Sequence, residues 1–217
     1  GRGPGGRMSS RRIATDAGEA VFDHGAQYFT ARDPGFAAQV DAWAEAGVCA
    51  PWPAAGEDAW VGTPAMNAPI RALAAEADVT WGCQVEALSA APDGWRLHTS
   101  QGDQGPFDQV VLALPAEQTA PMAAPHAPDM AQAARDTRSA PCWTLMTAFA
   151  ERLPVETDTL RDHGAIGWAA RNSAKPGRAA LETWVIQASP DWSATHLELE
   201  AHDAADRLAS AFAEATG

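Results

Sequence analysis

The sequence predicts a mixed α/β fold with an α/β part in its N-terminal half and a β-rich part, closed by a long helix, after it. Three observations support this prediction. Residues 107–114 (FDQVVLAL) end in an almost unbroken apolar run, which is typical of a strand buried on both faces of a sheet. Residues 34–47 carry apolar side chains four and three positions apart between a proline and a glycine, as an amphipathic helix does. Three apolar segments then follow at residues 142–149, 165–170 and 181–188.

The remaining elements follow from local patterns along the chain. Residues 1–12, 48–59 and 101–106 have the composition of loops and turns. Short strands are predicted at residues 19–23, 60–62, 79–88 and 95–99. Helices are predicted at residues 66–77, in part of the Ala- and Pro-rich stretch 116–140, and after the capping pair Ser189-Pro190, where Leu197, Ala201, Leu208 and Phe212 share one face.

Charge and size narrow the possible partners. The chain has 217 residues, enough for one large domain or two interleaved ones. Its net charge is −13 with a single lysine, and this argues against nucleic acid as a partner, because phosphate backbones require a basic surface. Four arginines nevertheless gather near the N-terminus, and such a cluster predicts a local anion: Arg2, Arg7, Arg11 and Arg12.

Other site classes find little support. The three cysteines are widely spaced, which argues against a disulfide framework or a zinc site and fits free thiols in the cytoplasm. His196 and His202 lie on different faces of a helix, so no metal site is predicted there. Apolar runs are too short to span a membrane, and no signal peptide is recognised.

The first six residues match G-x-G-x-x-G only formally, because no strand precedes them and no apolar helix follows. Gly5-Gly6-Arg7 offers a better unit. Paired glycines let backbone N–H groups approach a ribose or pyrophosphate, and the arginine adds charge-assisted hydrogen bonds. A flexible Gly/Arg arm is the alternative reading of these residues.

An ordered set of motifs identifies the family that the chain resembles. RGPGGRMSSRR at residues 2–12 and FDHGAQYFTAR at 22–32 are followed by WVGTPAMNA at 60–68, VVLALP at 110–115, PCW at 141–143, GWAARNSAKPGR at 167–178 and ETWVIQASPDWS at 182–193. The chain resembles the renalase-like, FAD-dependent oxidoreductases of bacteria, within the flavin amine oxidase group.

The resemblance implies a non-covalent FAD site. Gly5, Gly6 and Arg7 would lie along the ribose and pyrophosphate, and Gly25, Ala26, Gln27 and Tyr28 beside the isoalloxazine ring. Val85 would face the adenine, and Ala113, Leu114 and Pro115 would end a strand near the dinucleotide. Trp168, Asn172 and Trp184 would belong to the sheet that covers the flavin and could touch the substrate, or could be packed sheet residues.

The resemblance also implies a domain organisation. Residues 1–30 and 60–122 would form an FAD-binding, Rossmann-like domain, interleaved with a substrate-binding domain of residues 31–59 and 123–217 on a mixed or antiparallel sheet. The FAD-binding domain is expected to be incomplete. The family's dinucleotide fingerprint would precede Gly1, and its last FAD segment would follow Gly217, so we expect an internal fragment.

The implied activity is hydride transfer from a reduced nicotinamide isomer to flavin N5, with O₂ reoxidising the flavin to give hydrogen peroxide. No side chain is predicted to act as a nucleophile, because the flavin carries this chemistry. Oxidation of a small amine is the first alternative, and a non-catalytic flavin-fold module is the second. The expected partner is a small-molecule substrate in the cytoplasm, and the oligomeric state is left open.

Overall fold

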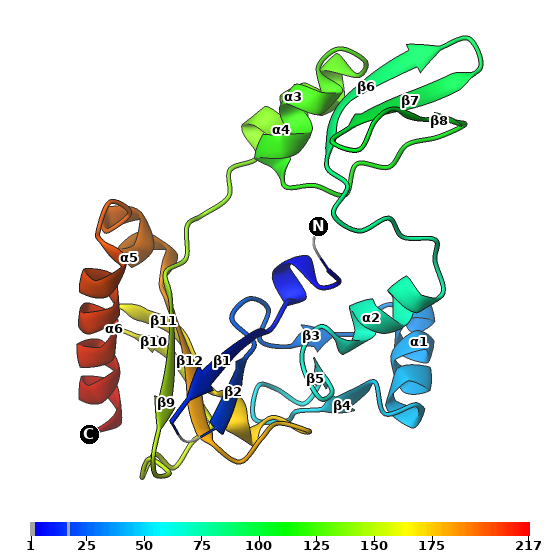
Figure 1. Cartoon of the computed structure of the whole chain (residues 1–217). Helices are drawn as coiled ribbons and strands as arrows, with labels where there is room; N and C mark the ends of the chain where they lie inside the picture. The colour runs from blue at the N-terminus through cyan, green and yellow to red at the C-terminus, as the bar shows by residue number, and fades with distance from the viewer. Residues whose placement is uncertain (1–2, 17) are drawn as a thin grey trace. The chain divides into compact units, whose positions relative to one another are not determined.

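The computed structural model describes residues 3–16 and 18–217 (Figure 1). These residues form two compact units. Unit 1 comprises Thr80–Ala140 together with Gly3, and unit 2 comprises Pro4–Val79 and Pro141–Gly217. Antiparallel sheets and helices occur in both units, so the predicted mixed α/β class is confirmed. The predicted FAD-binding and substrate-binding domains have other boundaries than these two units. That division stays a prediction.

A four-stranded antiparallel sheet is the centre of unit 2. Its strands are β9 (Thr144–Phe149), β10 (Thr159–His163), β11 (Ile166–Arg171) and β12 (Glu182–Ala188), in the order β10-β11-β12-β9. Side chains alternate across a strand, and β12 therefore packs on both faces. Trp184 and Ile186 belong to a cluster with Phe212 on one face, whereas Val185 contacts Ala20 and Phe22 on the other.

Helix α6 (Ala201–Thr216) and a hairpin cover this sheet (Figure 1). The helix buries Ala204, Leu208 and Phe212, which follow a four-residue spacing. The other face is covered by the hairpin of β1 (Arg11–Thr15) and β2 (Gly18–Phe22). Helix α5 (Pro190–Thr195) begins as predicted, because the Ser189 side chain accepts a hydrogen bond from the Trp192 N–H.

A smaller three-stranded sheet completes unit 2. Its order is β3-β5-β4, from β3 (Phe29–Thr30), β5 (Ala59–Gly62) and β4 (Cys49–Pro51). Helix α1 (Pro34–Glu45) packs against it through Val40 and Trp43, and Asp33 caps the helix as N-cap. The other elements here are α2 (Ala68–Ala75) and the short 3-10 helices η1 (Gly6–Met8) and η2 (Asn172–Ala174).

Unit 1 combines a β-meander with two helices. Strands β6 (Val85–Ala91), β7 (Gly94–Thr99) and β8 (Gln104–Phe107) pair in sequence order, and α3 (Ala116–Ala123) packs against α4 (Pro128–Asp136). The turn predicted between β6 and β7 is present at residues 92–93. Both helices lie in the Ala- and Pro-rich stretch where helix was expected.

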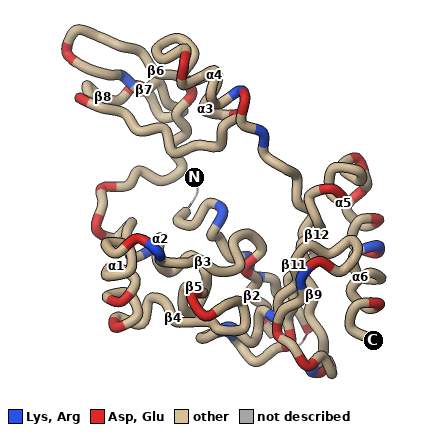
Figure 2. Tube along the Cα trace, turned by 180° about the vertical axis from the view of Figure 1, so that it is seen from behind, with Lys and Arg blue, Asp and Glu red and all other residues tan. Residues whose placement is uncertain are grey.

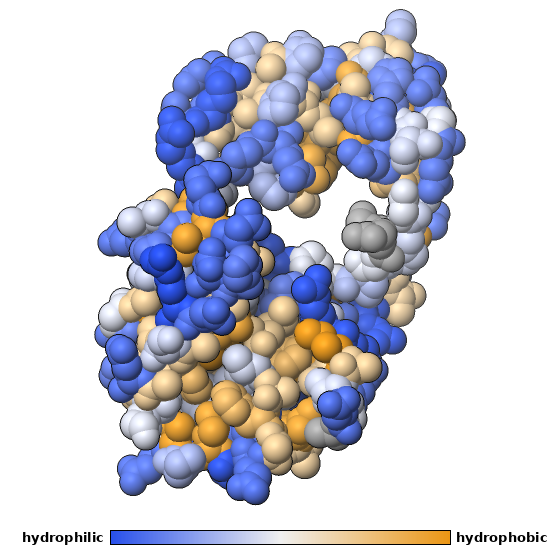
Figure 3. Space-filling model, turned by 60° about the vertical axis from the view of Figure 1, so that its left-hand side comes forward, coloured by the Kyte–Doolittle hydropathy of each residue, from blue (hydrophilic) through white to orange (hydrophobic). Residues whose placement is uncertain are grey.

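The buried strand predicted at residues 107–114 is wrong. Only Phe107 is part of a strand, and Val111 is 88% exposed. An apolar run becomes a strand only where a neighbouring strand supplies hydrogen-bond partners, and no sheet among the described residues receives this segment. Apolar residues of this segment are therefore exposed to solvent. Figure 3 shows that apolar residues also occur elsewhere on the surface of both units.

Smaller errors share this origin. Residues 11–12 are strand rather than loop because β2 pairs with them, and pairing likewise creates β4 and β8 within predicted loops. Strand β6 begins at Val85 rather than at residue 79, and β10 was not predicted. Leu197 precedes α6 and is 55% exposed, so it does not share the buried face of that helix.

In Figure 2 the helices of unit 2 carry red and blue segments, which mark charged residues. On α6, for example, Asp203 and Asp206 are exposed, whereas the apolar residues Ala204 and Leu208 are buried. None of the helices in the described part of the chain is both long and apolar enough to cross a bilayer.

Candidate functional site

The loop at Gly5–Arg7 lies directly against the turn at Gly25–Ala26. The Ala26 N–H donates a hydrogen bond to the Arg7 carbonyl at 2.9 Å. A Cβ atom on Gly25 would overlap that same carbonyl oxygen, so only glycine permits this approach. The structure thus brings together two of the predicted cofactor segments, which are separated by nearly twenty positions in the sequence.

The loop itself depends on its paired glycines. Gly5 has φ 136° and Gly6 has φ 50°, both in the region that favours glycine. Met8 N–H donates to the Gly5 carbonyl at 2.7 Å and closes the turn. The Arg7 side chain remains exposed, so its guanidinium is available to an anion. Gly1 and Arg2, which belong to the formal fingerprint and the arginine cluster, lie outside the described residues.

The described arginines near the N-terminus lie in two different elements. Arg12 lies on the exposed hairpin and forms an ion pair with Glu19 at 2.7 Å across the two strands. Arg11 stands beside it on β1. Arg7 alone, of the described members of this group, lies in the loop that meets Gly25.

A buried ionic cluster centred on Asp23 lies next to the turn at Gly25–Ala26. The Asp23 carboxylate, which is fully buried, accepts hydrogen bonds at one oxygen from Ser10 Oγ at 2.6 Å and from the Met66 N–H at 3.0 Å. Its other oxygen accepts from Arg178 Nη2 at 2.6 Å and from Lys175 Nζ at 3.3 Å. We call Asp23, Gln27, Lys175 and Arg178 the Asp23 cluster.

Burial and charge act in opposite directions in this cluster. Burial raises the pKa of Asp23, but Lys175, Arg178 and the Ser10 hydroxyl outweigh it and lower that pKa to about 2. Burial lowers the pKa of Lys175 to about 8, although the adjacent carboxylate opposes this shift. Asp23 is therefore ionised at neutral pH, whereas the lowered pKa of Lys175 lies close to neutral pH.

Two glutamine side chains hold the backbone of the turn. Gln27 Nε2 donates to the carbonyls of Asp23 and Gly25, the latter at 3.1 Å, and its Oε1 accepts from Lys175 Nζ at 3.0 Å. Gln187, on β12, donates through Nε2 to the carbonyls of His24 at 3.3 Å and Gly25 at 2.9 Å. Three successive carbonyls therefore accept from side-chain amides, which fixes the peptide planes of the turn.

The predicted substrate residues occupy three different environments. Asn172 is fully buried, donates to the Val21 carbonyl at 2.7 Å and accepts from the Asp23 N–H at 3.3 Å. Trp184 is also fully buried, and its Nε1–H donates to Glu182 at 2.9 Å while its ring packs on Phe212. Both residues have packing and hydrogen-bonding roles within the chain, and substrate contact by either of them stays a prediction.

Trp168 differs from those two because it lies next to the predicted site. Its ring centroid is 5.6 Å from that of Tyr28, and the Arg161 guanidinium lies 4.2 Å above the indole. The Trp168 Nε1 and His24 Nδ1 atoms are buried and have no hydrogen-bond partner among the described residues. Substrate contact by Trp168 stays a prediction.

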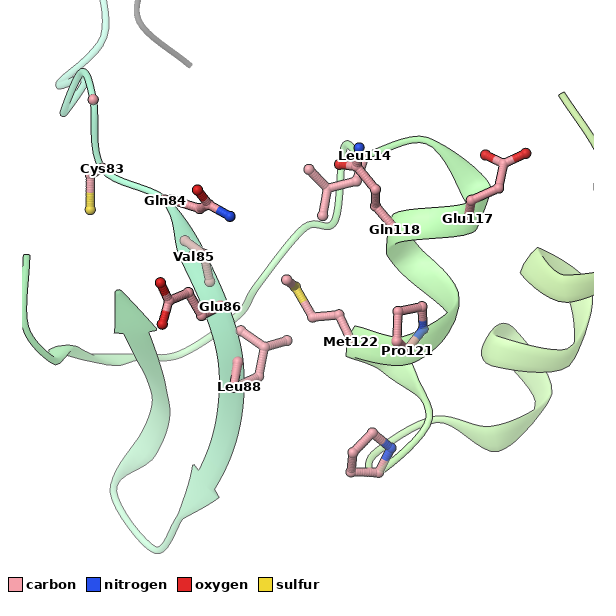
Figure 4. A pocket seen from close by; sticks show the side chains of 13 residues that line it. Cys83, Gln84, Val85, Glu86, Leu88, Leu114, Glu117, Gln118, Pro121 and Met122 are labelled. Carbon is pink, nitrogen blue, oxygen red and sulfur yellow. The ribbon is translucent and has the colours of Figure 1, made fainter. Parts of the chain in front are cut away.

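The other predicted cofactor residues lie in unit 1. Val85 and Leu114 line one hollow of about 1000 Å³ between β6 and α3, together with Met122 (Figure 4). Ala113 precedes Leu114 in the extended segment, and Pro115 is the N-cap of α3. The structure therefore brings Val85 and Leu114 together. Their meeting with the unit 2 residues at one cofactor stays a prediction.

Sequence reasoning missed most of the Asp23 cluster. It selected Gln27 through the family resemblance but assigned no role to Asp23, Lys175 or Arg178, and it also passed over Gln187. One signal was available: Lys175 is the only lysine of the chain, within a motif already quoted for the resemblance.

Comparison with known proteins decides the family. Residues 53–211 match the family model described as flavin containing amine oxidoreductase. The chain belongs to this flavin amine oxidoreductase family. The matched range includes the whole four-stranded sheet of unit 2, strand β5 of its smaller sheet, and the whole of unit 1 apart from Gly3.

Individual relatives of this flavin amine oxidoreductase chain are much longer than it is. One is the tRNA 5-methylaminomethyl-2-thiouridine biosynthesis bifunctional protein MnmC of Magnetococcus marinus, 39% identical over 90 residues, which are 35% of this chain and 13% of that protein. A crystal structure described as a protoporphyrinogen oxidase of Exiguobacterium sp. 255-15 matches with a TM-score of 0.45 and 16% identity, over 60% of this chain and 31% of that one.

The residues of unit 2 fit a flavin cofactor of the kind that the family name describes. A close backbone approach at Gly25, an exposed arginine at residue 7 and the buried, unpartnered His24 Nδ1 together form a surface with polar groups on offer. The close approach at Gly25 is made by the Arg7 carbonyl, so it holds together the two segments that are predicted to contact the cofactor, and the exposed Arg7 guanidinium suits a phosphate.

Removing the Ser10 hydroxyl is expected to lower the stability of the fold only modestly. Ser10→Ala removes one hydrogen bond to Asp23, whose other partners remain, so we expect the free energy of unfolding to fall by about 1–2 kcal/mol. Urea denaturation measures this change. An effect above about 4 kcal/mol would mean that the hydroxyl does more than donate to the carboxylate.

Proposed function

We propose that this chain forms part of an FAD-dependent oxidoreductase that binds FAD non-covalently. The family match supports the cofactor, and one structural observation supports its place. The Gly5–Arg7 loop contacts Gly25–Ala26 so closely that a side chain at residue 25 is excluded. Gly5, Gly6 and Arg7 would hold the ribose and pyrophosphate, and Gly25 to Tyr28 would border the flavin ring.

The chain's own residues bind and orient in this proposal. When bound, FAD supplies hydride acceptance and electron transfer, which no side chain can supply. Arg7 would neutralise phosphate charge, and the side-chain amides of Gln27 and Gln187 would keep the turn in one conformation. Tyr28 and Trp168 would offer aromatic surface that excludes water from the reacting atoms.

A reduced nicotinamide isomer is the donor that we propose, with O₂ as acceptor and hydrogen peroxide as product. The renalase-like motifs quoted above support this choice, and the Tyr28–Trp168 pair supplies an aromatic surface for a planar ring. A small amine is the second candidate donor, which the family's description favours. A non-catalytic flavin-fold module is the remaining alternative. We propose that nucleic acid is not a partner, which the net charge of −13 supports. We also propose a cytoplasmic location, which the three free cysteines support, and no membrane partner, which the short apolar runs support.

Flavin content tests the cofactor directly. We expect protein expressed from the complete reading frame that encodes this chain to be yellow, with about one FAD per protein released on denaturation. Mass spectrometry of the denatured protein should show no flavin adduct. Protein that folds but neither retains nor takes up FAD would contradict the proposal and leave the non-catalytic module.

A donor screen separates the two candidate reactions. Reduced nicotinamide isomers and small amines are mixed with the anaerobic, flavin-loaded protein, and loss of the oxidised flavin band is followed. We expect bleaching by a reduced nicotinamide isomer and peroxide formation once air is admitted. Bleaching by amines alone would refute the nicotinamide proposal and establish amine oxidation.

A further inference from the structure

Lys175 is a buried lysine whose ammonium contacts both ends of the segment that contains the Gly25–Ala26 turn. Its side chain is fully buried, directly after η2, and its ammonium contacts Asp23 Oδ2 at 3.3 Å and Gln27 Oε1 at 3.0 Å. The Trp52 ring centroid lies 5.2 Å away. Both hydrogen-bond acceptors of this ammonium thus come from the ends of one short segment, residues 23–27.

Lys175 is not needed to neutralise Asp23. Arg178 already donates to the same carboxylate oxygen through Nη2 at 2.6 Å and Nε at 3.2 Å. Protonated Lys175 therefore places a second positive charge against one carboxylate in a buried cluster. An unbalanced buried charge opposes folding, and burial accordingly lowers the pKa of Lys175 to about 8.

Lys175 helps to fix the direction of the Gln27 amide. An ammonium only donates hydrogen bonds, so it selects the orientation in which Gln27 Oε1 faces it. The Gln27 NH₂ group then faces the opposite way and donates to the carbonyls of Asp23 and Gly25. Without the ammonium, Gln27 Oε1 loses its hydrogen-bond donor, so the amide is held at one end only and its hydrogen bonds to the turn weaken.

We propose that Lys175 is a positioning residue: it orients the Gln27 amide and thereby holds Gly25 and Ala26 against the Gly5–Arg7 loop. The expected effect of Lys175 on flavin reduction rests on the proposed function. The groups that face the ammonium are Asp23 after β2, Gln27 in the turn, Trp52 after β4 and Arg178.

Lys175→Met in the complete protein tests this role. Methionine fills a similar volume without charge and leaves Asp23 paired with Arg178. We expect an unfolding temperature equal to or above that of the wild type, because the surplus charge is gone. Amide hydrogen exchange of the peptide covering residues 24–28 should rise about tenfold, since local opening becomes easier. Flavin reduction by the donor should slow about tenfold through loss of orientation.

Arg171→Met is the matched control. Arg171 is equally buried and ion-paired but contacts Glu182, Asp158 and nearby carbonyls rather than residues 23–28. We expect this variant to lose thermal stability while exchange at residues 24–28 and the reduction rate per bound flavin stay at the wild-type level. The pH profile adds a third readout: a step near pH 8 in the wild-type reduction rate should be missing from Lys175→Met.

The exchange measurement does not require flavin, so it separates this inference from the proposed function. Absence of flavin in the wild type would contradict the function and leave the exchange test intact. Wild-type exchange at residues 24–28 in a folded Lys175→Met variant would overturn the positioning role. Should that variant fail to fold, Gln27→Leu removes the acceptor and keeps the Asp23–Arg178 pair, and unchanged exchange there overturns the role equally.

Discussion

Replacing Gly25 with alanine is expected to lower the affinity for FAD by about 100-fold, which corresponds to about 3 kcal/mol. The added methyl group would overlap the Arg7 carbonyl oxygen, a backbone atom that cannot rotate away as a side chain could. The loop at Gly5–Arg7 must then move off the turn and lose the hydrogen bond from Ala26. Fluorescence titration of the apo-protein with FAD measures the affinity.

Gly3→Ala is the control for this prediction. A Cβ atom at Gly3 meets nothing within 4 Å, and its backbone is not in the left-handed region. We expect wild-type FAD affinity and stability from this variant. Full affinity in Gly25→Ala would show that the contact between loop and turn is not part of the cofactor site.

Elements with local determinants could be predicted from the sequence. Helix α1 begins at Pro34, where Asp33 caps it. The spacing selected Phe36, Val40 and Trp43, of which Val40 and Trp43 are buried and Phe36 is 39% exposed. Strand β12 and the capped start of α5 were found for similar reasons. In each case the signal lies within one turn or one strand, so no knowledge of distant segments is needed.

Features that depend on distant partners could not be predicted. The apolar run at 107–114 has the composition of a buried strand, yet strand formation requires a neighbour that composition does not specify. Asp23 meets Lys175 across 152 positions, and neither residue carries a local sign of the other. The family resemblance selected two glycine-containing segments that the structure brings into contact, but it did not indicate the buried charged residues next to them.

Replacing Asp23 with asparagine is expected to lower the free energy of unfolding by about 3–5 kcal/mol at pH 7, because it leaves Lys175 and Arg178 buried without a counter-charge. Glu19→Gln makes the same chemical change at an exposed ion pair with Arg12 and should cost at most about 1 kcal/mol. Urea denaturation of both variants compares them. Equal losses would mean that burial adds nothing to the Asp23 interaction.

The pH dependence of this loss distinguishes the charge of Asp23 from its packing. The folded-state pKa of Asp23, about 2, lies below its unfolded value of 3.8, so its contribution of about 2 kcal/mol is complete above pH 4 and disappears as the pH falls towards 2. Asp23→Asn should lack this acid-dependent part of the stability.

Lys175 affects the stability of this variant at neutral and alkaline pH. Without the carboxylate its ammonium becomes still less favourable, so it releases its proton at a lower pH than in the wild type. Stability of the variant should therefore begin to rise with pH before that of the wild type does, and the deficit should shrink between about pH 6 and pH 8. A deficit that is constant across this range would mean that Lys175 is already neutral in the folded wild type, and that Arg178 alone supplies the counter-charge for Asp23.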